Sequence, residues 1–173
     1  MGKITHQYGE LVFNQKEMKN RLGTTTYERY QDTLNNGAPL DESIAEDISR
    51  AVKEWALEKG ATHFTHWFQP QRSGTAEKHD AFIDYNGGGH IIEKFSASQL
   101  IQSEPDASSF PSGGIRTTFE ARGYTAWDPT SPLFLRDEDG GRSLIIPSIY
   151  LSWTGEALDM KTPLHRSLAA LNK

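Results

Sequence analysis

Hydrophobic positions in the first half of the chain recur with the period of a helix. They form one stripe down a single face of a predicted helix over Glu42–Lys59. Asp41 stands at the N-cap, and Gly60 follows where a helix often ends in a left-handed residue. This pattern predicts a long helix that packs its apolar face on a sheet. The stripe consists of Ile44, Ile48, Ala51, Val52 and Trp55.

Two shorter helices are predicted before it, both from their capping residues. Asn14 precedes a helical stretch over Gln15–Leu22, and Thr25 or Thr26 caps a second over Tyr27–Leu34. Both stretches are short, so we expect them to dock onto another part of the fold.

Further helices are predicted later in the chain. Ser96 or Ser98 opens a short one that runs through Ile101. Thr162 and Pro163 are suited to begin the last one, which is still amphipathic where the sequence stops. We therefore expect the chain to be one part of a longer protein.

Between these helices the hydrophobic period changes to that of strands, with aromatic and β-branched residues bounded by turn residues. The NGGG sequence between two apolar runs predicts a hairpin, and Pro147 predicts a bend or an edge in the last strand. Together the elements predict an α+β fold, with about five or six short strands in a mixed sheet and a long helix across one face. The predicted strands are Leu11–Phe13, Thr62–Gln69, Ala81–Tyr85, His90–Phe95, Ile115–Ala121, Leu133–Arg136 and Ser143–Ser152.

Composition excludes several classes of protein. The 173 residues suit one domain, and 36% hydrophobic residues with four Trp, six Tyr and eight Phe indicate a globular chain. The net charge of −5 and the scattered Lys and Arg argue against nucleic acid as a partner. No apolar run is long enough for a membrane span or a signal peptide, so we expect a soluble, cytoplasmic protein. With no cysteine, any metal would need His and carboxylate ligands.

Histidines and acids offer one weak metal hypothesis. In a strand, His63 and His66 point to opposite faces, so they cannot easily share one ion. A small independent metalloenzyme would have to use His66 together with residues of the segment TAEKHD. In that segment a carboxylate could also orient an imidazole as a general base, although a solvated loop is the better interpretation. The ligands of this hypothesis would be His66, Glu77, His79 and Asp80.

The stretch EPDASSFPSGG, residues 104–114, is the remaining candidate. Its Asp, Ser and Gly content allows a rigid turn in which hydroxyls and backbone amides fix the carboxylate of Asp106. From the residues alone, a structural loop and a functional loop are about equally supported.

Three long blocks of the chain resemble the N-terminal region of type III glutamine synthetases, the large bacterial form. They are THFTHWFQPQRSGTAEKHDAFI, FSASQLIQSEPDASSFPSGGIRTTFEARGYTAWDPTSP and SWTGEALDMKTPLHRSLAALNK. The resemblance implies an N-terminal helical extension over 1–40, a β-grasp-like domain over 41–160, and over 161–173 the start of a helix leading to an absent catalytic domain.

For the full-length enzyme, the resemblance implies ATP-dependent ligation of ammonia to glutamate through a γ-glutamyl phosphate, with Mg or Mn. It also implies a double-ring dodecamer, in which this domain meets the catalytic domain of a neighbouring subunit. The ATP site and the metal ligands of the family belong to the absent domain. We therefore expect no cofactor in the 173 residues, and no synthetase activity from them alone.

The resemblance also gives the loop a role. The wider family completes a neighbour's active site with an Asp-Gly-Ser-Ser loop, matched here by Asp106, Ala107, Ser108 and Ser109. Asp106 would bind ammonium and help to remove its proton, and Ser109 would lie at the edge of the same site. This chain has Ala107 where the wider family has glycine, and alanine disfavours a positive φ at that position.

A second interpretation keeps the family and changes the role. The chain could be a free-standing, non-catalytic module that assembles with a full-length glutamine synthetase and modulates it. The amphipathic last helix favours the interpretation as part of an enzyme.

Overall fold

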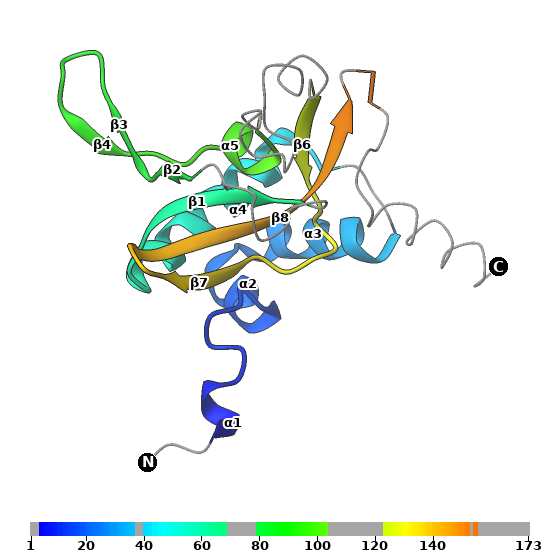
Figure 1. Cartoon of the computed structure of the whole chain (residues 1–173). Helices are drawn as coiled ribbons and strands as arrows, with labels where there is room; N and C mark the ends of the chain where they lie inside the picture. Colours follow the sequence, from blue (N-terminus) through cyan, green and yellow to red (C-terminus); the bar gives the residue numbers. More distant parts are fainter. Residues whose placement is uncertain (1–3, 37–39, 69–78, 104–122, 153, 156–173) are drawn as a thin grey trace.

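The computed structural model describes residues 4–36, 40–68, 79–103, 123–152 and 154–155. Within these residues four helices come first, followed by four strands, a fifth helix and four more strands (Figure 1). The helices are α1 (Ile4–Gln7), α2 (Gln15–Arg21), α3 (Thr24–Asn36), α4 (Glu42–Glu58) and α5 (Ala97–Ile101). The strands are β1 (Ala61–Trp67), β2 (Asp80–Ala81), β3 (Ile83–Tyr85), β4 (Ile91–Glu93), β5 (Gln102–Ser103), β6 (Gly123–Trp127), β7 (Phe134–Glu138) and β8 (Gly141–Ser152).

Six of these strands form one mixed sheet. Its order is β2-β1-β8-β6-β5, and β7 also pairs with β8. The central pair β1 and β8 is parallel, whereas the other pairs are antiparallel. The predicted α+β class, with a β-grasp-like mixed sheet and a long packing helix, is therefore confirmed.

Strand β8 organises the sheet. Its first half pairs with β7 and its second half with β6, and Pro147 lies where the neighbour changes. The carbonyl of Pro147 accepts a hydrogen bond from the backbone of Asp128 at 2.9 Å, but a proline has no N–H to return it. A proline is tolerated here because the antiparallel ladder is already interrupted. Of the two predicted alternatives, a bend or an edge, the edge is wrong, because Pro147 also pairs with Trp67 of β1.

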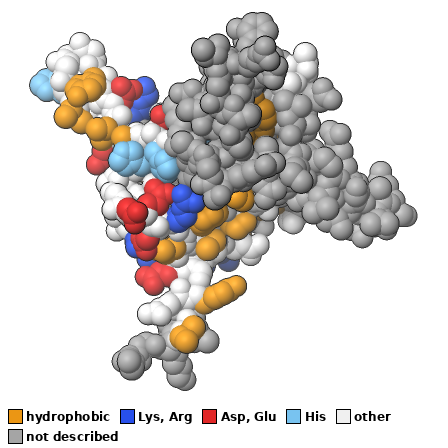
Figure 2. Space-filling model, viewed as in Figure 1, with side chains coloured by type: hydrophobic (Ala, Val, Ile, Leu, Met, Phe, Trp, Pro, Cys, Tyr) orange, Lys and Arg blue, Asp and Glu red, His pale blue; other side chains and the backbone are white. Residues whose placement is uncertain are grey.

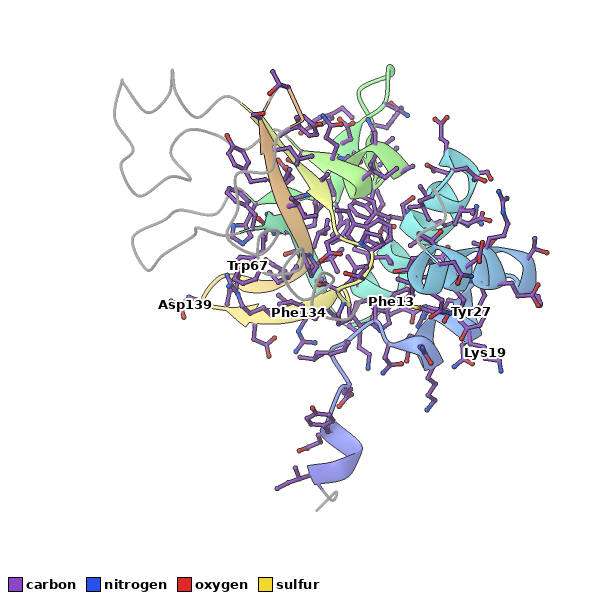
Figure 3. All side chains as sticks on the ribbon, turned by 90° about the vertical axis from the view of Figure 1, so that its right-hand side faces the viewer. Phe13, Lys19, Tyr27, Trp67, Phe134 and Asp139 are labelled. Carbon is purple, nitrogen blue, oxygen red and sulfur yellow. The ribbon has the colours of Figure 1, made fainter. Side chains whose placement is uncertain are left out.

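The hydrophobic core lies between the sheet and the helices. Figure 3 shows α2, α3 and α4 on one side of the strands, with Phe13 on that side. The rings of Phe13 and Trp55 lie 5.2 Å apart, and both side chains are fully buried. The predicted stripe of α4 faces this core, since all five of its residues are buried.

Helix boundaries agree with the predicted caps in most places. The side chain of Asp41 accepts a bond from the backbone of Ile44 at 3.0 Å, and Gly60 adopts φ +83°. Asn14 caps α2 by accepting two backbone bonds, and Ser96 rather than Ser98 caps α5. The predicted start of α3 is wrong: the helix begins at Thr24, and the hydroxyl of Thr26 donates to Asp47 at 2.7 Å instead of capping.

The segment 11–13 forms only an isolated bridge, between Val12 and Phe134, and not a strand. The predicted strand over 115–121 and the last helix lie outside the described residues. Within the described part of the chain, no helix has the length and apolar character needed to cross a bilayer.

Candidate functional site

Strands β5 and β6 bring the two ends of segment 104–122 to one edge of the sheet. Gln102 pairs with Ala126 and Ser103 pairs with Thr125. The hydroxyl of Thr125, which is fully buried, donates to the carbonyl of Ser103 at 3.0 Å. Asp106 and Ser109 belong to this segment and lie outside the described residues. What the structure describes is therefore the frame that holds the segment's two ends.

Helix α5 connects this edge to the long helix. The backbone N–H of Ala97, at the start of α5, donates to the carboxylate of Glu46 on α4 at 2.9 Å. The side chain of Gln99 accepts from the backbone N–H of Ser96 at 3.0 Å, and Leu100 is fully buried. These contacts fix α5, which leads directly into β5.

A buried histidine joins α5 to the centre of the sheet. The Nε2 atom of His66 lies 2.8 Å from the carbonyl of Gln99, and Nδ1 lies 2.8 Å from the hydroxyl of Ser148. Burial lowers the pKa of His66 to about 4, so the ring is neutral at pH 7. A neutral ring that donates from Nε2 to a carbonyl must accept at Nδ1. The hydroxyl of Ser148 lies within donating distance of this nitrogen and also of the carbonyl of Ile146, at 3.0 Å.

A hollow of about 610 Å³ lies beside this frame. Leu40 and Glu42 line it from the start of α4, and Gln102 and Ser103 line it from β5. The hollow thus adjoins the point where segment 104–122 leaves the sheet. Its lining mixes apolar, amide, hydroxyl and carboxylate groups.

Of the segment TAEKHD the structure describes His79 and Asp80, and His79 contacts an acid from outside the segment. Nε2 of His79 lies 3.2 Å from the carboxylate of Glu138, which also accepts bonds from Arg136 and Ser143. Burial opposes ionisation of Glu138, but these hydrogen bonds and the nearby charges outweigh it, and the pKa of its carboxyl is lowered. An acid therefore does contact this imidazole. No local pattern could predict this contact, because Glu138 lies 59 residues further along the chain.

The metal hypothesis gains no support from the described residues. His63 is exposed and His66 is buried, as expected for positions on opposite faces of β1. Both ring nitrogens of His66 already have partners, and Glu77 lies outside the described residues. Among the residues that the structure describes, no three His, Asp or Glu side chains are grouped to hold a metal ion.

The frame of the loop escaped the sequence-based predictions. A two-residue strand such as β5 has too few residues for a periodic signal. Strand β6 was not predicted either, although exposure alternates along it, with Thr125 and Trp127 buried.

Comparison with known proteins identifies the family. The family described as glutamine synthetase type III N terminal matches residues 4–167. A glutamine synthetase of Bacteroides fragilis is 51% identical over 171 residues, and a type-3 glutamine synthetase of Dictyostelium discoideum is 48% identical over 167 residues. These matches cover 99% and 96% of this chain.

A glutamine synthetase of Butyrivibrio fibrisolvens is more distant, with 30% identity over 173 residues. The chain spans only 23% of the length of the first two relatives and 24% of the third. Together with the family match over almost the whole chain, these alignments show which part of such a protein is present. The chain belongs to the type III glutamine synthetase family and corresponds to its N-terminal region.

Proposed function

We propose that this chain is the N-terminal part of an enzyme that joins ammonia to glutamate at the expense of ATP. In this proposal, segment 104–122 completes the active site of a neighbouring subunit, with Asp106 as the ammonium-binding acid and Ser109 at the edge of the site. The partner is the catalytic domain of that neighbour, in a cytoplasmic double-ring dodecamer.

One observation carries the proposal: the pairing of β5 with β6 closes segment 104–122 into a loop anchored at both ends. Asp106 is three residues past Ser103, so chain geometry keeps its Cα within about 11 Å of that anchor. An anchored acid can be held in one place on a partner's surface, whereas an acid on a free tail would lose that position to chain entropy.

The chemistry suits a carboxylate. An ammonium ion has no free electron pair and must lose a proton before its nitrogen can attack. A carboxylate attracts the cation and then accepts that proton. The freed ammonia bonds through its nitrogen to the acyl carbon of γ-glutamyl phosphate, and the bond from that carbon to the bridging oxygen breaks. Phosphate leaves and takes up the proton that the nitrogen loses as it becomes an amide. Positioning and proton transfer are the two contributions that we assign to Asp106.

The described residues do not fit ATP or its metal ions. No group of three metal-binding side chains occurs among them. The sequence has neither GxxxxGK[ST] nor GxGxxG. We therefore assign the ATP and Mg or Mn sites to the remainder of the full-length protein, and we expect the 173 residues alone to be inactive.

Two nucleophiles test the role of Asp106 in the full-length enzyme. Asp106→Asn should reduce kcat/KM for ammonium by roughly 10²-fold or more, the usual range for a lost general base. The same variant should lose far less activity when hydroxylamine replaces ammonium as the nucleophile. Hydroxylamine is largely neutral near pH 7, so it needs no prior deprotonation. Asp139→Asn, in the turn between β7 and β8, is the matched control. Equal activity of Asp106→Asn and wild type at limiting ammonium would show that the assignment is wrong.

A further inference from the structure

The β3–β4 hairpin carries an apolar face that the described fold leaves open. Its register places Tyr85 opposite Ile91 and Ile83 opposite Glu93, and cross-strand partners share a face. Ile83, Tyr85 and Ile91 are 57%, 69% and 65% exposed. The hairpin projects from the body of the domain (Figure 1), and Figure 2 shows hydrophobic side chains gathered on it.

The base of the hairpin is built into the core. The ring of Phe82, almost fully buried, lies 5.2 Å from that of Phe64 and 5.4 Å from that of Phe95. The backbone of Lys94 donates to the carbonyl of Phe82 at 2.9 Å. A two-stranded hairpin is barely stable alone, so this anchor is what holds it in place.

The tip is also ordered by specific contacts. The backbone N–H of Asn86 donates to the carbonyl of His90 at 2.9 Å, and Gly89 adopts φ +77°, which closes the turn. The ammonium of Lys94 lies 2.5 Å from the carboxylate of Asp84, on the face opposite to Tyr85. The face of Asp84 thus carries this ion pair together with Ile92, and the opposite face carries the open side chains of Ile83, Tyr85 and Ile91 together with Glu93.

The size of the apolar face limits what can cover it. A stable association of two separate proteins buries roughly 800 Å² on each partner, which is more than a few side chains on one short hairpin can offer. A small apolar contact is sufficient where another connection already holds the two surfaces together at high effective concentration. The matched relatives provide such a connection, since this region is only 23% of their length and the remainder belongs to the same polypeptide.

We propose that the face formed by Ile83, Tyr85 and Ile91 is a docking element, which seats on an apolar surface of the part of a type III glutamine synthetase that lies outside this N-terminal region. The inference rests on the family, and not on the role of Asp106. Failure of the Asp106 assignment would leave the docking contact in place.

Site-specific photocrosslinking in the assembled full-length enzyme tests this contact. Benzoylphenylalanine replaces Tyr85, and in a control protein it replaces Asp84 on the opposite face. We expect the Tyr85 probe to give crosslinks to peptides outside the region that matches residues 4–167, in clear excess over the Asp84 probe. Crosslinks confined to the N-terminal regions, as in pairing of two hairpins, would overturn the proposal, and so would no crosslink at all.

Serine substitutions give a second, independent measurement. Ile83→Ser with Ile91→Ser should lower the melting temperature of the full-length assembly, because the buried apolar contact is lost. Tyr8→Ser is the matched control, since Tyr8 is 91% exposed and belongs to a different part of the chain. An unchanged melting temperature in the hairpin variant would contradict docking, because it would mean that both side chains stay largely exposed in the assembly, where replacement costs little.

Discussion

The hydroxyl of Thr125 donates a hydrogen bond to the backbone carbonyl of Ser103, 3.0 Å away, across the antiparallel pair that closes segment 104–122. The two residues stand at the two ends of the loop that we assign to a neighbouring active site. Because Thr125 is fully buried, water cannot replace the bond. The stability of this one pair therefore bears directly on the position of the loop.

Thr125→Val keeps the shape of the side chain and removes its hydroxyl. We expect a loss of about 1 kcal/mol in the free energy of unfolding, the usual value for one buried hydrogen bond. In the full-length enzyme we also expect a higher KM for ammonium, since the loop loses an anchor. Urea unfolding and ammonium-dependent kinetics check the two effects. Thr25→Val, on the exposed surface of α3, is the control and should change neither.

His66 should make stability depend on pH. Its pKa in the folded chain is about 4, below the roughly 6.5 of an exposed histidine. Between these two pKa values the unfolded state therefore binds more protons than the folded state. The contribution of the neutral His66 ring to the free energy of unfolding is fully present above about pH 6.5. It is lost as the pH falls towards 4.

His66→Gln removes this titration and retains a donor for Gln99 and an acceptor for Ser148. Urea unfolding over pH 4 to 7 should show a shallower fall of stability for the variant, with a difference of roughly 3 kcal/mol across the window. Parallel curves for the two proteins would mean that His66 does not titrate in this way.

The cap of α2 is a simple test of local energetics. The side-chain oxygen of Asn14 accepts bonds from the backbone of Lys16 at 3.0 Å and of Glu17 at 3.1 Å. Asn14→Ala should cost about 1 kcal/mol of unfolding free energy. Lys16→Ala, at an exposed position in the same turn, should change it little, and thermal unfolding distinguishes the two variants. A similar loss in both would assign the effect to the helix surface and not to the cap.

Local signals predicted the helices best. The signals for α4 all lie within one segment of the sequence, from Asp41 through the apolar stripe to Gly60. The helix follows these signals closely. The start of α3 was misplaced because a tertiary contact decides it. The hydroxyl of Thr26 binds Asp47 of α4 and is not used as a cap, a choice that its own segment does not encode.

Contacts between distant segments were the part that sequence patterns could not supply. The parallel pairing of β1 with β8 joins residues about 80 positions apart, and β5 has only two residues. The same limit applies to the site. The segment TAEKHD favoured a solvated loop, with its own acids as alternative partners of His79, whereas the acid that His79 contacts, Glu138, comes from β7. The role of Asp106 came from resemblance, and it remains a prediction because the residue lies outside the described part of the chain.

Complementation in mixed oligomers tests most directly whether Asp106 acts on a neighbouring subunit. One full-length variant carries Asp106→Asn, and a second carries a disabling substitution of a metal ligand in the catalytic domain. Each alone should be nearly inactive with ammonium. If the loop acts between subunits, dissociating and co-assembling the two variants should restore part of the wild-type activity, because some sites combine an intact loop with an intact catalytic domain. Mixed oligomers that form and remain as inactive as the separate variants would contradict the account.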